Sequence, residues 1–346
     1  MRPHDRTAAV LLPGGFDDAR GLTVDAAGNV YVANTGSDSV VEYPVKGSPI
    51  VVGGFHGPEG IALGPHGSLY VADTGANRVV RIAGGINGTT QVMPTPKGGY
   101  SSPKGISVDS AGDIFVADTG NNTVWKIAAA TSPRATPSAT PAAIATPNAP
   151  EDVAVDAGDN VYVTNSAPTS VPPPAYGATV YAAPSYSPLP IIFAKDKAGN
   201  QVWLTSRATG IAVDSTTSAS SPSPWVYVAV PVLHYVALAH EQHPCPKAST
   251  CYYQWSATRL LDNGLASPRG VAVLPGCGGA YKPSQGPACN LYVSDLAALR
   301  SGAVIEQSAQ NTTGNSNPGP VTIVAVSTLS IAGIAANAHS VAFTDP

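Results

Sequence analysis

One phrase recurs along this chain, and its recurrence constrains the fold more than any other feature. A clear copy occupies residues 21–36 and reads Gly-Leu-Thr-Val-Asp-Ala-Ala-Gly-Asn-Val-Tyr-Val-Ala-Asn-Thr-Gly. Close matches begin at Gly60 and Gly105. Fainter copies open at Asp152, which takes the glycine position, and at Gly210, Gly270 and Gly333. Successive copies start 39 to 63 residues apart, and such a period predicts a series of similar units packed on one another.

Each repeat carries the pattern of four short strands. In the second copy, residues 60–63 and 69–72 are apolar runs separated by a Pro- and Gly-containing turn. Residues 78–82 alternate charged and apolar side chains, and residues 90–93 can add a fourth strand. A four-stranded antiparallel sheet that must bury both faces packs against similar sheets around an axis, so the pattern predicts an all-β fold, the β-propeller.

The number of copies predicts the number of blades. Seven first strands favour seven blades, and six is the alternative if one weak copy is irregular. The last copy stops after two strands, at 333–336 and 340–343, so we expect the strand at 7–12 to complete the final blade and close the ring. Because the repeat runs through the chain, we expect a single domain over residues 1–346. The expected loop insertions lie at about 129–140, 167–175, 241–251 and 275–289.

The cysteines fall into two close pairs, each inside an insertion: Cys245 with Cys251, and Cys277 with Cys289. Two local disulfides are the natural interpretation. A zinc site is the alternative, but the spacings of these pairs do not match the usual zinc ligands. Disulfides predict export to an extracellular or cell-envelope location. Residues 1–6 are followed by no long apolar run, so a signal or anchor would have to precede this chain.

Composition narrows the classes of partner. A formal net charge of −4 argues against nucleic acid, and no stretch is apolar enough to span a membrane. The predicted core is large enough to fold without a second subunit, so we expect a monomer. A protein partner could use the aromatic residues Tyr252, Tyr253 and Trp255, next to the first cysteine pair.

The phrases at 67–80 and 105–124 resemble the NHL repeat, whose propellers include extracellular sensor domains of actinobacterial receptor kinases. Other members bind protein or RNA, and a few are lyases. The resemblance therefore implies the fold more firmly than the function. Related amidating and virginiamycin-type lyases place histidines and a divalent metal around the central axis. In this chain the histidines do not recur at one repeat position, so spacing does not support calcium, zinc or another cofactor.

One repeat position is unusually charged: the residue immediately before the glycine position of each first strand. Five of its seven occupants are charged, although charged residues make up only 12% of the chain. If the inner strands begin together at one face, these side chains ring the mouth of the central channel. They could receive a small polar ligand or a partner's charged tip. The alternative is a collar, meaning a ring of salt bridges among these residues that only holds the inner strands together. The predicted mouth residues are Arg20, Glu59, Lys104, Glu151, Thr209 and Arg269.

These patterns favour a non-enzymatic binding or sensor propeller. The alternative is a propeller lyase or hydrolase with a metal-assisted site at the channel mouth, for which His56 and Glu59 are the acid–base candidates. A third possibility is a structural repeat protein of the cell envelope. No nucleophile elbow, phosphate loop or metalloprotease motif occurs in the chain.

Overall fold

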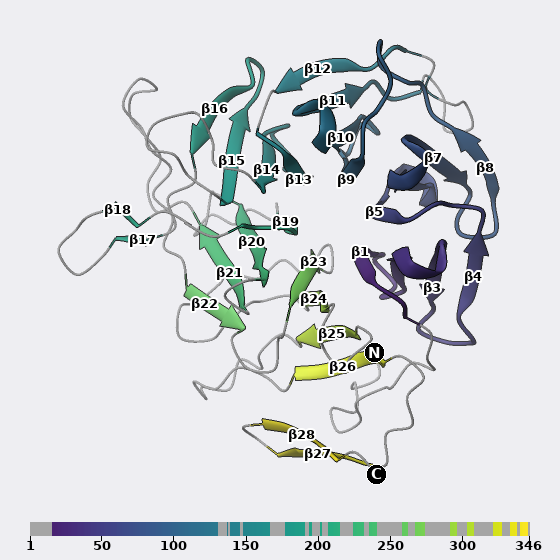
Figure 1. Cartoon of the computed structure of the whole chain (residues 1–346), viewed down its shortest axis with the longest axis vertical. Coiled ribbons are helices and arrows are strands. Elements are labelled where there is room, and N and C mark those ends of the chain that lie inside the picture. The colour runs from purple at the N-terminus through teal and green to yellow at the C-terminus, as the bar shows by residue number, and fades with distance from the viewer. Residues whose placement is uncertain are drawn as a thin grey trace.

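The protein is an all-β propeller of antiparallel four-stranded blades, seen here in a computed structural model. In Figure 1 the sheets surround a common centre, with the first strand of each sheet innermost and the fourth at the periphery. This arrangement confirms the predicted fold class. The structure describes residues 16–130, 137, 139–145, 148–166, 177–190, 194–195, 201–202, 207–214, 224–231, 235–240, 258–261, 267–273, 291–295, 303–307, 321–326, 333–337 and 340–344.

The first three sheets follow the three clear copies of the repeat. The first contains β1 (Ala19–Val24), β2 (Val30–Asn34), β3 (Ser39–Tyr43) and β4 (Ile50–Gly53). The second contains β5 (Pro58–Leu63), β6 (Leu69–Asp73), β7 (Arg78–Ala83) and β8 (Thr89–Val92). The third contains β9 (Pro103–Val108), β10 (Ile114–Asp118), β11 (Thr123–Ile127) and β12 (Ala142–Ala145). Short 3-10 turns join these strands: η1 (Thr35–Ser37), η2 (Pro65–Gly67), η3 (Thr74–Ala76) and η4 (Thr119–Asn121).

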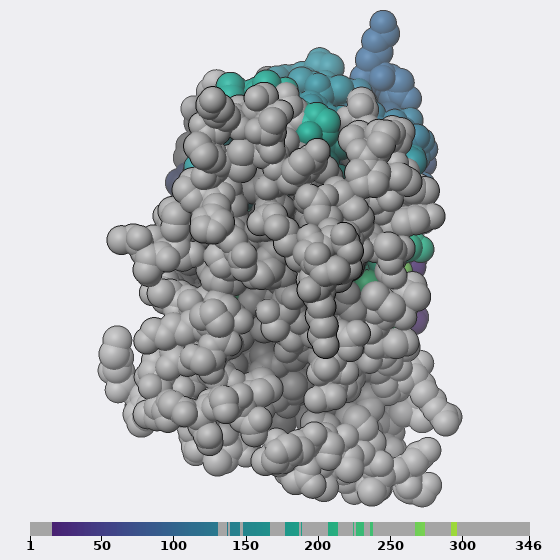
Figure 2. All heavy atoms as spheres, turned by 90° about the vertical axis from the view of Figure 1, so that its left-hand side faces the viewer, coloured from purple at the N-terminus to yellow at the C-terminus, as the bar shows by residue number. Residues whose placement is uncertain are grey.

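The next three sheets follow the fainter copies. The fourth contains β13 (Pro150–Val155), β14 (Val161–Asn165), β15 (Gly177–Ala182) and β16 (Ser187–Pro190). The fifth contains β19 (Ile211–Asp214), β20 (Trp225–Val230), β21 (Tyr235–His240) and β22 (Thr258–Leu261). The sixth contains β23 (Pro268–Val273), β24 (Leu291–Asp295), β25 (Ala303–Gln307) and β26 (Val321–Val326). A small hairpin, β17 (Ala194–Lys195) with β18 (Gln201–Val202), lies between the fourth and fifth sheets in sequence. The space-filling view places blue-to-teal residues of the third and fourth sheets along the upper edge of one side (Figure 2).

The prediction of seven blades is wrong, because the described residues form six four-stranded sheets. The seventh copy supplies only β27 (Gly333–Asn337) and β28 (Ser340–Thr344), which pair with each other in a separate two-stranded sheet. The first strand of the sixth sheet, β23, instead contacts β1 directly. The strand predicted at 7–12 lies outside the described residues.

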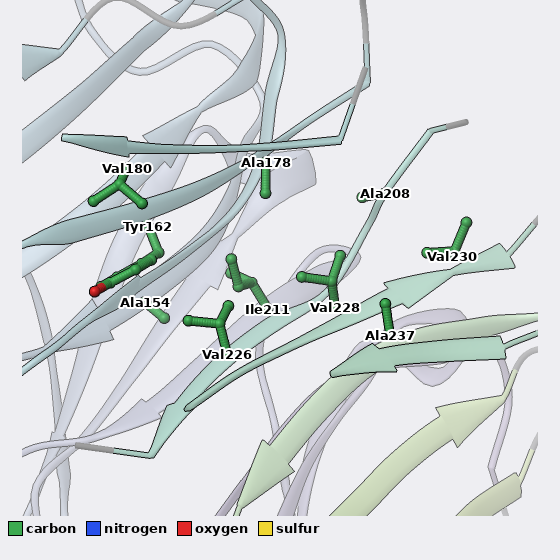
Figure 3. Packing of buried hydrophobic residues seen from close by; sticks show 10 residues of the cluster. All are labelled: Ala154, Tyr162, Ala178, Val180, Ala208, Ile211, Val226, Val228, Val230 and Ala237. Atoms are coloured by element: carbon green, nitrogen blue, oxygen red, sulfur yellow. The ribbon is translucent and has the colours of Figure 1, made fainter. Parts of the chain in front are cut away.

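The core lies between neighbouring sheets. The second strand of each of the first four sheets is buried along its whole length, because a blade is covered on both faces. Figure 3 shows the packing between the fourth and fifth sheets, where Tyr162 and Val180 face Ile211 and Val226. Between the sixth and first sheets, Tyr292 belongs to the same buried cluster as several side chains of β1 and β2.

In five of the six sheets a glycine lies near the start of the inner strand, because neighbouring inner strands approach closely there. A Cβ atom at Gly60 would lie 2.1 Å from the carbonyl oxygen of Lys104 in the next sheet. Gly21, Gly210 and Gly270 meet the following strand's backbone at 2.2–2.3 Å in the same way. A side chain at these positions would push two blades apart.

The turns Asn34-Thr-Gly, Asp73-Thr-Gly and Asp118-Thr-Gly of the clear copies connect each blade to the next. Their threonine hydroxyls donate hydrogen bonds across the boundary: Thr35 to the carbonyl of Pro58 (2.6 Å), Thr74 to Pro103 (2.7 Å) and Thr119 to Pro150 (2.6 Å). The residue that ends each turn has left-handed backbone geometry, and its side-chain oxygen accepts from a backbone N–H of the following blade. These pairs are Asp38 with Gly57, Asn77 with Ser102, and Asn122 with Ala149.

The aspartates after the first strands cap their own turns. The Asp25 carboxylate accepts hydrogen bonds from the backbone N–H groups of Ala27 and Asn29 at 2.9 and 2.8 Å. Asp156 does the same for Gly158 and Asn160 in the fourth sheet. These oxygens stabilise turns and do not form a cation cage.

Candidate functional site

The first strands of the six sheets surround a central cavity of about 350 Å³. Each of these strands contributes residues to its wall. All six predicted mouth residues line the cavity: Arg20, Glu59, Lys104, Glu151, Thr209 and Arg269. The repeat position therefore converges on one place.

The alternating charges on the first four blades form two ion pairs. The Arg20 guanidinium lies 3.0 Å from the Glu59 carboxylate, and the Lys104 ammonium lies 2.9 Å from Glu151. Arg20 also contacts Asp18 at 3.0 Å. The charges of Arg20, Glu59, Lys104 and Glu151 therefore neutralise one another. For these four residues the collar of salt bridges is the interpretation that fits.

Glu151 is the most deeply embedded acid of the mouth. Its side chain is 7% exposed and forms ion pairs with both Lys104 and Arg207. Burial alone would raise the pKa of Glu151, but the two cations outweigh burial and hold its pKa below the usual value. Glu151 is therefore a carboxylate near neutral pH, and it is shared between two positive charges.

Arg269 differs from the other mouth cations, Arg20 and Lys104, in its contacts. No carboxylate among the described residues forms an ion pair with Arg269, and its buried Nε lacks an acceptor. The Nε of Arg207 is likewise buried and without an acceptor, although its terminal nitrogen binds Glu151. Burial, together with the charges of Arg20 and Arg207, lowers the pKa of Arg269. Three guanidiniums thus lie near one another: Arg207, which precedes β19, Arg269 on β23 and Arg20 on β1.

Asp152 lines the cavity at the position that glycine holds in the other inner strands. One carboxylate oxygen accepts from the backbone N–H of Val153 at 2.9 Å, and the other accepts from Ile211 in the fifth sheet at 3.0 Å. Burial raises the pKa of Asp152 to about 7, and the neighbouring Glu151 charge acts in the same direction. The sequence signal was visible as the departure from glycine, but its role was not predicted.

The remaining predicted residues behave differently from one another. The Thr209 hydroxyl donates to the carbonyl of Arg269 at 3.0 Å, so it links two blades. His56 is exposed and is not among the residues that line the cavity, whereas Glu59 is. The proposed acid–base pair is therefore not assembled at the cavity. The four cysteines and the aromatic patch Tyr252, Tyr253 and Trp255 lie outside the described residues.

The donor set at the axis does not fit a divalent metal. No histidine is among the residues lining this cavity, and its carboxylates Glu59 and Glu151 are neutralised by cations, while Asp152 accepts backbone hydrogen bonds. Within the described part of the chain, no three His, Cys, Asp or Glu residues are grouped to hold an ion. Over the same residues, the structure contains no helix long and apolar enough to cross a membrane.

Comparisons with known proteins agree with the repeat and the fold. A family model described as the NHL repeat matches residues 55–82 and 100–127, which confirms the resemblance found in the sequence. No curated protein matches the chain.

Three solved structures illustrate the likeness in fold. Virginiamycin B lyase from Staphylococcus aureus has 13% identity and a TM-score of 0.53, with 94% of this chain and 91% of that chain covered. A streptogramin B lyase has 12% identity and a TM-score of 0.56, with 96% of this chain and 92% of that chain covered. A gluconolactonase from Xanthomonas campestris has 12% identity and a TM-score of 0.55, with 84% of this chain and 90% of that chain covered. At these identities the shared property is the propeller fold.

Proposed function

We propose that this β-propeller with NHL repeats is a monomeric binding protein that receives a small polar ligand at the mouth of its central cavity. The observation that carries the proposal is the convergence of charged side chains from successive blades on one cavity of about 350 Å³. That volume lies in the range of small-molecule sites, about 300–1,000 Å³. The Arg269 guanidinium at its wall forms no ion pair with a described carboxylate, and its buried Nε has no hydrogen-bond acceptor.

The experiment is a thermal-melt screen of small polar metabolites against the wild type and a channel-filling variant. Ser107 lines the cavity on β9, so Ser107→Phe would occupy the space without changing its charge. Ser110→Phe is the matched control, because Ser110 is exposed in a turn outside the cavity. A compound that stabilises the wild type and S110F but not S107F supports the proposal. Stabilisation that S107F retains would place binding elsewhere.

A lyase or hydrolase at the same cavity is the second candidate, and Asp152 favours it. A carboxyl group with a pKa of about 7 can accept or donate a proton near neutral pH. Solved structures of similar fold include a lyase and a gluconolactonase. If a compound found in the screen is consumed by the wild type and not by Asp152→Asn, the enzymatic candidate replaces simple binding.

Export to an extracellular or cell-envelope location is part of the same proposal. Its support is the two close cysteine pairs in the sequence. Titration of free thiols in the unreduced, denatured protein tests it. Two disulfides leave no free thiol, whereas four free thiols would contradict the proposal.

A further inference from the structure

We propose that the ligand of the cavity mouth is a small anion bearing a carboxylate or phosphoryl group, and that Arg269 binds its charge between Arg20 and Arg207. This inference rests on the proposed function, because it names the chemical class received at the same site. Arg269 and Arg20 line the cavity, and Arg207, four residues before β19, is close enough to repel Arg269.

The distribution of charge around the mouth is uneven. Glu59 and Glu151 are engaged by Arg20, Lys104 and Arg207, so the arc formed by the first four blades has little charge to offer. On the opposite side of the mouth, Arg269 forms no ion pair with an acid in the described part of the chain, and Arg20 and Arg207 repel it. Glu151 and Asp18 attract Arg269 only from a distance. A bound anion would supply the missing countercharge.

An unpaired, partly buried arginine is costly to maintain in the ligand-free protein. A buried donor without an acceptor loses its hydration and gains no bond in return. Arg269 and Arg207 each leave a buried Nε without an acceptor, so the desolvation penalty applies to two N–H groups in the same region. A ligand that provides the acceptors would account for both groups.

The geometry of guanidinium selects the class of ligand. Its planar fork of donors matches the two oxygens of a carboxylate or phosphoryl group. Lys104 would be the weaker receptor here, because its ammonium already binds Glu151 at 2.9 Å. The cavity volume of about 350 Å³ limits the ligand to a small molecule or the tip of a larger one.

The test compares the wild type with Arg269→Gln in thermal melts and calorimetric titrations at constant ionic strength, balanced with NaCl. The probes are inorganic phosphate, malonate and, as an uncharged control, glycerol. We expect phosphate or malonate to stabilise the wild type, and glycerol at the same concentration to have no effect. The loss of a charge-assisted pair should weaken anion binding by about 10- to 100-fold in R269Q. The phosphate and malonate arms identify which group the site prefers.

Two further variants make the result specific. Lys97→Gln removes one positive charge from an exposed loop outside the cavity and should keep the wild-type affinity. Arg269→Lys keeps the charge and removes the fork, so it should bind anions more weakly than the wild type while folding normally. Without any anion, R269Q should melt above the wild type, because it relieves repulsion. A purely structural arginine would give the opposite shift.

Each failure points to a different claim. If anions stabilise R269Q and R269K as well as the wild type, Arg269 does not bind them and the inference is overturned. An anion effect that persists in Ser107→Phe would show adventitious surface binding, which also overturns it. If uncharged compounds bind in an S107F-sensitive way and neither phosphate nor malonate does, the inference fails and the proposed function stands. If no compound shows S107F-sensitive binding, both fail.

Discussion

The Asp152 carboxylate accepts a hydrogen bond from the backbone N–H of Ile211 at 3.0 Å, joining the fourth and fifth sheets. The other five inner strands have glycine at the equivalent position. Gly21, Gly60, Gly210 and Gly270 lie against a backbone carbonyl of the next inner strand, whereas here a side chain spans the gap. The fourth and fifth blades are therefore joined by a titratable group that also lines the candidate site.

This junction should make stability depend on pH. The folded pKa of Asp152 is about 7, above its ordinary value of 3.8, so the folded state retains a proton that the unfolded state releases. Stability from this group is complete at low pH and falls as pH rises from about 4 to about 7. We expect the wild type to lose a few kcal/mol relative to Asp152→Gly across that range, measured by urea unfolding at each pH. A constant difference between the two proteins would contradict the assignment.

Glu151, one residue earlier, should show the opposite pH dependence. Its folded pKa is lowered, so the stability it contributes is present above its ordinary value of 4.5 and is lost as pH falls further. At pH 7, Glu151→Gln leaves Lys104 and Arg207 without their shared partner and should cost about 2–3 kcal/mol in urea unfolding. Glu42→Gln is the control, since no cation among the described residues pairs with Glu42. Equal losses in the two variants would argue against the shared pair.

Close packing of the inner strands predicts an unequal response to alanine. At Gly60 the added Cβ would lie 2.1 Å from the Lys104 carbonyl oxygen, so Gly60→Ala should lower the free energy of unfolding by about 3 kcal/mol. Gly53, on the outer strand β4, has nothing within 4 Å of the same Cβ position. Gly53→Ala should be neutral or stabilising by about 0.5 kcal/mol. Similar unfolding free energies for the two variants would refute the close approach.

The threonine of the Asp-Thr-Gly turn should matter through its hydroxyl. Thr119→Val keeps the side-chain shape but removes the 2.6 Å hydrogen bond to Pro150 in the next blade. We expect a loss of about 1–2 kcal/mol in chemical denaturation. Thr90→Val, on the exposed face of β8, provides the matched control and should change stability by less than about 0.5 kcal/mol. No difference between the variants would mean that the hydroxyl does not fasten the blades.

Much of the fold could be predicted, because its unit is written repeatedly in the sequence. Apolar runs and turn residues mark the four strands of each clear copy, and the structure places strands there. The blade count failed at the copy beginning at Gly333, since the phrase identifies only the first two strands of a blade. Those two strands pair with each other, and local sequence does not specify which sheet such a pair joins.

The sequence could predict where the charged residues of the candidate site meet, but not which cation pairs with which acid. The mouth residues share one repeat position, so their convergence followed from register. Asp18 and Arg207 were missed, although each lies two residues before a mouth position. Which cation meets which acid depends on the spacing between blades, and that spacing is set by packing far from the charged residues. That the buried Nε of Arg269 lacks an acceptor could therefore be recognised only from the structure.

A crystal structure grown with the compound that gives the largest S107F-sensitive thermal shift would test the central claim most directly. We predict density for that compound in the central cavity, in contact with mouth residues of at least two blades, including Arg269. Density for the compound on the outer face or between molecules, with the cavity holding only solvent, would contradict a binding site at the mouth.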